Sequence, residues 1–476
     1  MFLASQWQYR GEGHVSLVLF RTKEPPIVLR LRKKFVSVEA KMEAHGSYAL
    51  HGSTAEQLSY VESVMKPLLG SEFVLQQRIV QLPQQFVEDI SKKVAVHRPS
   101  KRCCKTVDCD LGEAILMPDV CFLPSTDAKL PVPDTRKVYE ISVPFVHKQL
   151  ADGYQMAMDE DIPTFCVEIK PKCGFLHLSS TSRKKPSCKF CMFQILKVKN
   201  GKWELPSAYC PLDLFSGNLR RVKIALHGLL KTPQNNLKVF KNGVVVYTGD
   251  IGESSLQDQL DRLTKHFRPY MCGPVKESLV DLLARILTAP QCEREQLEKQ
   301  PVCSRSATAE RPEIVIANGI NTDPRTRPCK ILDAVLNIQR WDDLGSHGIL
   351  PYYRRLLDHL KGCPDDRKRW GIDVPVSHVD QNAALASSDD GSVEYALQKV
   401  RHYLVAATAK DCSIMISIKP RQTIANACRE LTFDYAVAVV DLDPKGIERV
   451  DKYVHEDRAI LDMYLALLEN DQYHNQ

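Results

Sequence analysis

The chain has 476 residues, of which 44% are hydrophobic and 26% are charged. This length is more than one ordinary hydrophobic core needs, so the composition predicts two or more packed units and excludes a mostly disordered chain. The formal net charge of +6 excludes a strong overall field, so an anionic ligand would have to be bound by a local cluster of basic side chains.

The sequence lacks the marks of a membrane or secreted protein. No run of 18 apolar residues indicates a transmembrane helix, and the first residues lack the basic and apolar regions of a signal peptide. The 16 cysteines are irregularly spaced, which favours free thiols in a reducing compartment over a disulfide framework. Cys188 and Cys191 have the spacing of metal ligands, but without an obvious second pair we interpret them as buried thiols.

In the first third of the chain, apolar periodicity and proline breaks predict both strands and helices. The predicted strands are 7–20, 27–32 and 73–82, and the predicted helices are 54–66 and 84–95. Pro67 should end the first of these helices. The apolar run 113–123 is broken by Pro118 and could cross between two lobes. Residues 124–163 contain several spaced prolines, among them Pro124, Pro131, Pro133 and Pro144, and are predicted to be an irregular insertion or connection.

The remaining two thirds of the chain also mix the two periodicities. The predicted helices are 187–199, 219–231, 255–290, 331–361, 391–409 and one from about 457. The predicted strands are 413–418 and 433–442, with a buried strand that runs into a basic turn over 164–175 and a hairpin over 237–248 around Asn242 and Gly243. The polar segment 291–330 is predicted to be a mobile loop.

A glycine-rich stretch near the start resembles the phosphate-binding loop of kinases. It consists of Gly11, Glu12, Gly13, His14, Val15 and Ser16, followed by Leu17 and Val18. The kinase pattern is G-x-G-x-x-G-x-V, and serine replaces its third glycine here. Glycine lets backbone amides approach phosphate oxygens closely, although a plain hairpin turn fits the same residues. Arg30 then occupies the place of the kinase strand lysine, where it could hold an ATP phosphate or be solvated.

Basic and amide side chains recur around later strand ends. Lys170 and Lys172 flank a proline in a turn after a buried strand, and two lysines so close together favour an anion between them. Lys197 lies near the end of a predicted helix. Asn235, Asn236 and Lys238 follow in a polar turn, which could bind phosphate or be an ordinary turn. Asp119, beside Pro118, could face the nucleotide or cap a solvated turn.

Carboxylates at two late positions in the chain are candidates for the chemistry of phosphoryl transfer. Asp411 precedes a predicted strand, and Asp441 and Asp443 follow the next one. This order matches the kinase aspartate that orients the acceptor and the later aspartate that binds magnesium. Either position is also compatible with a structural cap. Lys445, Arg449 and Tyr453 follow at about helical spacing, with the last two on one face.

Taken together, these motifs resemble one family, inositol-pentakisphosphate 2-kinase. The matching strings are GEGxxSLV (11–18), VEIKPKCGF (167–175), PLDLFSG (211–217), TPQNNLKVFKNG (232–243), AATAKDCSIMIS (406–417) and DLDPK (441–445). The resemblance implies an α+β fold with two lobes, distantly similar to protein kinases. It implies a smaller N-lobe sheet with helices over 1–122 and a larger α/β C-lobe over 123–476. It also implies transfer of the ATP γ-phosphate to the 2-hydroxyl of inositol 1,3,4,5,6-pentakisphosphate, which gives phytate.

The resemblance also implies roles for single residues. Asp411, as base or orienter, and Lys170 would lie by the 2-hydroxyl, and Asp441 would bind Mg²⁺. The glycine-rich residues, with Arg30 and Asp119, would bind ATP. The positions expected to bind substrate phosphates are Arg102, Lys172, Lys197, Asn235, Asn236, Lys238, Lys445, Arg449 and Tyr453. The expected enzyme is a monomer of the cytoplasm and nucleus that acts on a small molecule and needs neither membrane nor nucleic acid.

The sequence departs from the family in two places and leaves two other functions open. Phe193 replaces a family histidine and cannot bond to phosphate. Plant members carry a zinc site of two histidines and a Cys-x-x-Cys, of which Cys363 alone remains, with His378 downstream; we therefore expect no zinc there.

The alternatives are an inositol-phosphate kinase of other regiospecificity, or a non-catalytic scaffold that binds inositol phosphates or RNA. No RNP motif supports RNA binding.

Overall fold

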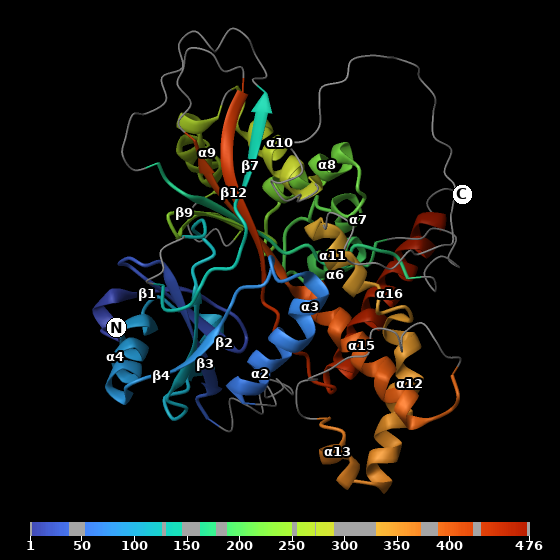
Figure 1. Ribbon diagram of the computed structural model, residues 1–476. Coiled ribbons are helices and arrows are strands. Elements are labelled where there is room, and N and C mark those ends of the chain that lie inside the picture. Colours follow the sequence, from blue (N-terminus) through green and yellow to red (C-terminus); the bar gives the residue numbers. More distant parts are fainter. Residues whose placement is uncertain are drawn as a thin grey trace, which may run out of the picture.

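A computed structural model describes residues 2–37, 53–125, 130–144, 162–177, 188–249, 255–271, 273–289, 330–372, 389–421 and 430–473. Over these residues the fold is α+β with two antiparallel sheets, each of six strands (Figure 1). None of the helices in these ranges is both long and apolar enough to cross a membrane. The predicted mobile loop 291–330 and His378 lie outside the described residues, apart from Lys330.

The first sheet is built from the N-terminal residues. Its strands are β1 (Trp7–Glu12), β2 (Ser16–Arg21), β3 (Ile27–Phe35), β4 (Arg78–Gln81), β5 (Lys105–Val107) and β6 (Glu113–Pro118). They pair in the order β1-β2-β3-β6-β4, and β5 pairs with β3. The predicted strand 7–20 is therefore a hairpin, because the glycine-rich residues turn the chain between β1 and β2. The predicted strand 73–82 is wrong in its first half, since only Arg78–Gln81 pairs.

One face of the first sheet is covered by α4 (Gln84–Ala95). Leu17 and Leu19 of β2 alternate toward this face, and they pack with Phe86 and Ile90 of the helix in one apolar core. A short 3₁₀ turn, η1 (Ala4–Gln6), precedes β1, and another, η3 (Ser100–Arg102), connects the end of α4 to β5. Arg98 bonds to Glu12 and Lys105 contacts His14, so both lie beside the glycine-rich turn.

A bent helix follows the first three strands. It consists of α2 (Thr54–Tyr60), the π-helical turn η2 (Val61–Met65) and α3 (Lys66–Leu69). The prediction that Pro67 ends this helix is wrong: the N–H of Lys66 bonds to the carbonyl of Val61, so the widened turn accommodates the proline. Tyr60, Phe73 and their apolar neighbours pack in the core of the second sheet, not of the first.

The second sheet contains strands that are far apart in the sequence. They are β7 (Tyr139–Pro144), β8 (Phe165–Ile169), β9 (Leu237–Lys241), β10 (Val244–Thr248), β11 (Ser413–Pro420) and β12 (Glu430–Val440), in the order β10-β9-β8-β11-β12-β7. The predicted hairpin at Asn242 and Gly243 is confirmed, with φ of 47° and 77°. The prediction of an irregular segment over 124–163 is wrong for β7, which pairs with β12.

Some of the remaining helices lie beside the second sheet, and others pack on one another away from it, as Figure 1 shows. They are α6 (Lys189–Lys199), α7 (Pro211–Leu214), α8 (Leu219–Lys231), α9 (Leu256–Phe267), η5 (Arg268–Tyr270), α10 (Val275–Thr288), α11 (Ile331–Gln339), α12 (Gly345–Gly362), α13 (Asp365–Arg369), α15 (Val393–Asp411) and α16 (Arg449–Tyr473). The predicted helices 255–290 and 331–361 are each interrupted, and the final helix begins at Arg449 instead of 457. A separate apolar core joins α12, α15 and α16.

Candidate active site

The register of the second sheet brings four chain segments to one edge. Ile169, at the end of β8, pairs with Ile414 of β11 and with Leu237 at the start of β9. Ser413 pairs with Val440 at the end of β12. The residues just beyond these pairs therefore lie side by side. They are Lys170, Asn236, Asp411 and Asp441, all predicted site residues.

Backbone strain is concentrated at the same edge. Of the residues described, four that are not glycine have positive φ, and three of them are Lys172 (60°), Gln234 (45°) and Asp441 (61°). Such conformations cost on the order of 1–3 kcal/mol each and cluster at functional sites. Hydrogen bonds stabilise the strained conformation of Lys172. Buried Gln339 donates to the Lys172 carbonyl (2.8 Å), and Tyr209 donates to the Pro171 carbonyl (2.6 Å).

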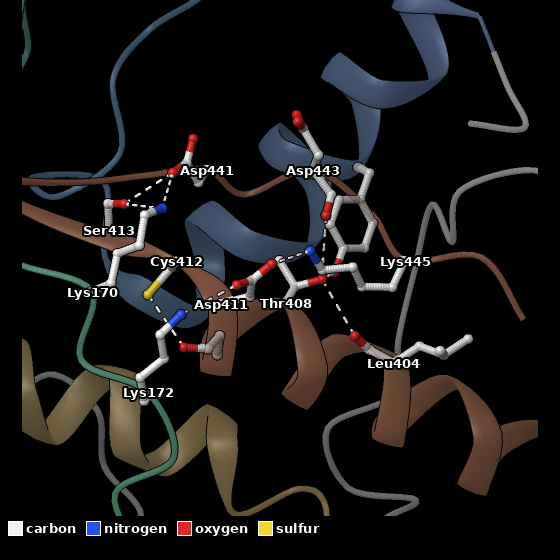
Figure 2. A network of polar contacts seen from close by, with 12 residues as sticks. Lys170, Lys172, Leu404, Thr408, Asp411, Cys412, Ser413, Asp441, Asp443 and Lys445 are labelled. Carbon is white, nitrogen blue, oxygen red and sulfur yellow. Dashed lines mark hydrogen bonds and ion pairs between the residues drawn. The ribbon is translucent and has the colours of Figure 1, made fainter. Parts of the chain in front are cut away.

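Lys170 and Asp441 form the first polar cluster of the site (Figure 2). The Lys170 Nζ lies 2.8 Å from Asp441 Oδ2 and 2.9 Å from Ser413 Oγ. Ser413 Oγ also lies 2.9 Å from the same carboxylate oxygen and 3.0 Å from Glu168 Oε1. Burial opposes the charge of Asp441, but the ion pair with Lys170 outweighs it and lowers the pKa of the carboxyl. Asp441 is therefore ionised at neutral pH.

Asp411 is the centre of the second cluster. It is the last residue of α15, and its carboxylate lies 2.9 Å from Lys445 Nζ and 3.7 Å from Lys172 Nζ. Figure 2 shows both lysines directed at this carboxylate. Burial would raise the pKa of Asp411, but Lys445 and Lys172 lower it. The side chain is still 58% exposed, so an ionised carboxylate faces solvent and can accept a hydrogen bond from a ligand.

The glycine-rich turn is fixed by a buried ion cluster. Glu12 accepts hydrogen bonds from Arg98 at 2.8 and 2.9 Å and pairs with Lys33, and Lys33 also donates to the Gly13 carbonyl. The Glu12 and Lys33 side chains are each 1% exposed. The carboxylate of Glu12 therefore stabilises the turn and is engaged within the protein. This cluster could not be predicted from the sequence, because Arg98 lies 86 residues from Glu12.

Arg30 and Asp119 lie apart from each other and in different surroundings. Arg30 donates to both carboxylate oxygens of Asp443, at 2.8 and 3.0 Å, and so joins β3 to the residues that follow β12. Asp119 is 1% exposed and pairs with Arg10 at 2.7 Å. Arg30 thus lies near the Asp441 cluster, whereas the Asp119 carboxylate is fully engaged by Arg10.

Several predicted substrate residues surround the two clusters. Asn235 is exposed, whereas Asn236 is 1% exposed and neither atom of its amide has a partner among the described residues. A buried amide without partners is costly, which suits a ligand contact. The Nζ of Lys238 lies 3.7 Å from Oε2 of Glu168.

The remaining predicted substrate residues lie on α6, η3 and α16. Arg449 and Tyr453 occupy the first turns of α16, and Arg102 ends η3. Lys197, near the end of α6, lies with its Nζ 4.2 Å from the centre of the Phe193 ring. The residue that replaces the family histidine thus makes a cation–π contact with the neighbouring lysine. Burial, Lys202 and Lys172 lower the pKa of Lys197 to about 8.

Two groups of side chains could hold a metal ion. Cys188, Cys191 and Cys210 bring their sulfur atoms within 4.8 Å of one another, so Cys210 supplies the partner that the sequence did not reveal. Hydrogen bonds from the other two thiols lower the pKa of Cys210, and thiolates are ligands that zinc prefers. His359, Cys363 and Asp366 form the other group. The expected absence of zinc stays a prediction.

Comparison with known proteins matches the chain to one family. The family model described as inositol-pentakisphosphate 2-kinase matches residues 9–459. The chain belongs to this family. A relative from Danio rerio named inositol-pentakisphosphate 2-kinase is 34% identical over 97% of this chain and 93% of the relative. One of the same name from Arabidopsis thaliana is 28% identical over the same shares.

Family membership confirms the resemblance drawn from the motifs. A further relative named inositol-pentakisphosphate 2-kinase, from Drosophila melanogaster, is 29% identical over 61% of this chain and 56% of its own length. Within this member of the family, the structure adds residues that motif reasoning missed. Ser413 and Glu168 connect Lys170 to Asp441. Asp443 was already a candidate carboxylate, and the structure adds its pairing with Arg30. Ser413 directly follows the KDC string, and this position is the sequence signal that could have indicated it.

Proposed function

We propose that this chain transfers the γ-phosphate of ATP to the 2-hydroxyl of inositol 1,3,4,5,6-pentakisphosphate, giving the hexakisphosphate. One observation carries the proposal: two ionised carboxylates, Asp411 and Asp441, lie at one sheet edge, and each is paired with a lysine of the same turn. A plain anion-binding scaffold gains nothing from carboxylates at its centre. Phosphoryl transfer needs both an orienter for the acceptor and a metal ligand.

Asp411 is placed to orient and deprotonate the acceptor hydroxyl. Its half-exposed carboxylate can accept the hydroxyl hydrogen bond, since Lys445 and Lys172 keep it ionised. The same two lysines can also meet the phosphates of the acceptor, because the carboxylate that they share is 58% exposed and a bound phosphate can compete with it for them. Lys170, held by Ser413, lies between Asp441 and the acceptor side, where its charge can meet the oxygens of the transferred phosphoryl group.

Asp441 fits the role of a magnesium ligand. Its Oδ2 is bound by Lys170 and Ser413, while its Oδ1 makes no hydrogen bond among the described residues. Carboxylate oxygens and substrate phosphates are the ligands that Mg²⁺ takes. When bound, the ion would neutralise charge on the ATP phosphates. Asp441 would hold it, and Arg30 would contact the nucleotide phosphates from β3.

The arrangement of the two sheets supports a finer proposal about the fold. We propose a distant likeness to protein kinases, with an N-lobe over 1–122 that binds nucleotide and a C-lobe over 123–476 that binds the inositol phosphate. The glycine-rich hairpin of the first sheet and the aspartates of the second support it. We also propose a monomer of the cytoplasm and nucleus, in keeping with the free thiols of the described residues.

The test is incubation of the purified chain with ATP, MgCl₂ and inositol 1,3,4,5,6-pentakisphosphate. Chromatography should show inositol hexakisphosphate, and nuclear magnetic resonance should place the new phosphate on the 2-position. A product phosphorylated elsewhere, such as a pyrophosphate, would contradict the assigned regiochemistry. Folded protein that binds the pentakisphosphate and yields no product would favour the scaffold.

A further inference from the structure

A buried lysine outside the predicted site lies beside the glycine-rich turn. Lys105, the first residue of β5, is 7% exposed. Its Nζ lies 3.1 Å from His14 Nε2 and 3.3 Å from the His14 carbonyl oxygen, and 4.3 Å from the centre of the Phe35 ring. Within the described ranges, no carboxylate pairs with it. Lys105 is therefore a desolvated cation whose partners are a ring nitrogen, a carbonyl and an aromatic face.

A buried charge without a counter-charge is unfavourable. The basic residues acting on Lys105 increase this cost: burial, Lys33, Arg449 and Arg102 together lower its pKa to about 8. Partial burial and Lys105 itself lower the pKa of His14 to about 4, so the imidazole is neutral and offers no compensation. Such a group is compensated when an anion binds.

The position of Lys105 links it to the acceptor and not only to the nucleotide. The Arg98 guanidinium donates to the carbonyl oxygens of Arg102 (3.0 Å) and Lys105 (2.7 Å), and the same group bonds to Glu12 of the turn. Arg102 and Lys105 are thus held together as one unit. Arg449, at the start of α16, is near enough to lower the pKa of Lys105 by charge repulsion. Both arginines are expected to bind acceptor phosphates.

We propose that Lys105 binds a phosphate group of the inositol acceptor, together with Arg102 and Arg449, and so helps to set the preference for a highly phosphorylated ring. This inference rests on the proposed function. It places one cation of the acceptor site on the first sheet, at the edge of the turn expected to bind ATP. Arg98 is then a positioning residue, because it fixes the two basic residues relative to Glu12.

The test compares Lys105→Met, which removes the charge and keeps the length, with Lys105→Arg, which keeps the charge. Lys34→Met is the matched control, because Lys34 is the next residue to Lys33 on β3 and pairs with Asp108 and Asp110 at the surface. Lys105→Met should raise KM for inositol pentakisphosphate about tenfold or more, the worth of one hydrogen bond to a charged group. KM for ATP should stay within about twofold, and Lys105→Arg should recover most of the loss.

A set of inositol tetrakisphosphate isomers sharpens the test. The isomer that lacks the phosphate bound by Lys105 should be used equally well by the wild type and by Lys105→Met. A penalty that persists for every isomer would overturn a direct contact. A rise in KM for ATP alone, or kinetics equal to wild type for both substrates, would also overturn it.

Two further measurements separate this inference from its basis. Thermal unfolding shows whether Lys105→Met is folded; if it is not, Lys105→Gln takes its place in the same comparison. If the wild type makes no hexakisphosphate, the proposed function fails on its own. Calorimetric binding of inositol hexakisphosphate then tests Lys105 directly, with weaker binding by the variant expected and equal binding overturning the inference.

Discussion

Replacing Asp411 with asparagine tests the proposed orienter most directly. The substitution keeps the shape of the side chain but removes the charge that pairs with Lys445 at 2.9 Å and Lys172 at 3.7 Å. A positioned base contributes about 10²- to 10⁴-fold to a rate. We therefore expect kcat to fall by about that factor in Asp411→Asn.

Binding should respond differently from turnover. Asp411 is 58% exposed, and exposed ion pairs are worth about 0–1 kcal/mol. Releasing Lys445 and Lys172 from this carboxylate should change the affinity for inositol phosphates by less than about tenfold, in the direction of tighter binding. Once released, the two lysines no longer have a carboxylate that competes with the phosphates of the ligand. The expected pattern is thus a large loss of kcat with an unchanged or lower Kd.

The assay combines single-turnover phosphoryl transfer from labelled ATP with calorimetric binding of inositol hexakisphosphate. Asp389→Asn is the matched control, since Asp389 also pairs with a basic residue, Arg355, at 2.9 Å but lies outside the strand ends. It should leave kcat unchanged. If Asp411→Asn keeps kcat within tenfold of the wild type, or loses binding and turnover together, the role assigned to Asp411 is refuted.

Three further outcomes follow from the geometry of the site. Asp441→Asn should raise the Mg²⁺ concentration for half-maximal rate, measured by titration of the metal; an unchanged midpoint would contradict the ligand role. Arg30→Met, which breaks the pair with Asp443, should raise KM for ATP about tenfold or more, and equal effects on both substrates would argue against a nucleotide contact. Inositol phosphate binding at pH 8.5 should take up protons, because the lowered pKa of Lys197, about 8, rises when phosphate binds. Calorimetry in two buffers measures this uptake, and Lys197→Met should reduce it, whereas equal uptake by both proteins would contradict the assignment.

Local patterns predicted most elements, because their causes are local. The Asn242–Gly243 turn and the helix over 219–231 follow from residues adjacent in sequence. The prediction that Pro67 ends the helix was wrong because a π-helical turn accommodates the proline. This turn depends on packing against the second sheet, which a local pattern does not reveal. The strand β7 was missed because its pairing with β12 joins residues nearly 300 positions apart.

The site shows the same division. Lys170, Asp411 and Asp441 could be found because each lies at the end of an apolar strand or helix within a recognisable string. Their partners could not be assigned, since pairing depends on the register of β8, β11 and β12. The third thiol, Cys210, was likewise hidden by distance in the sequence. The residues that carry the chemistry could thus be predicted from the sequence, whereas their pairing depends on how the strands of the second sheet align.

The bent helix of residues 54–69 has a consequence for how the chain can be divided. Tyr60, with a hydrogen bond to Thr408 of α15, and Phe73, whose carbonyl accepts from Val439, belong to the larger core although they precede β4 in sequence. A fragment of residues 1–122 would expose this apolar surface to water and should aggregate, and 123–476 alone would lack part of its interior. The enzyme should therefore melt in a single transition, and cutting the chain at residue 122 should not yield two stable halves.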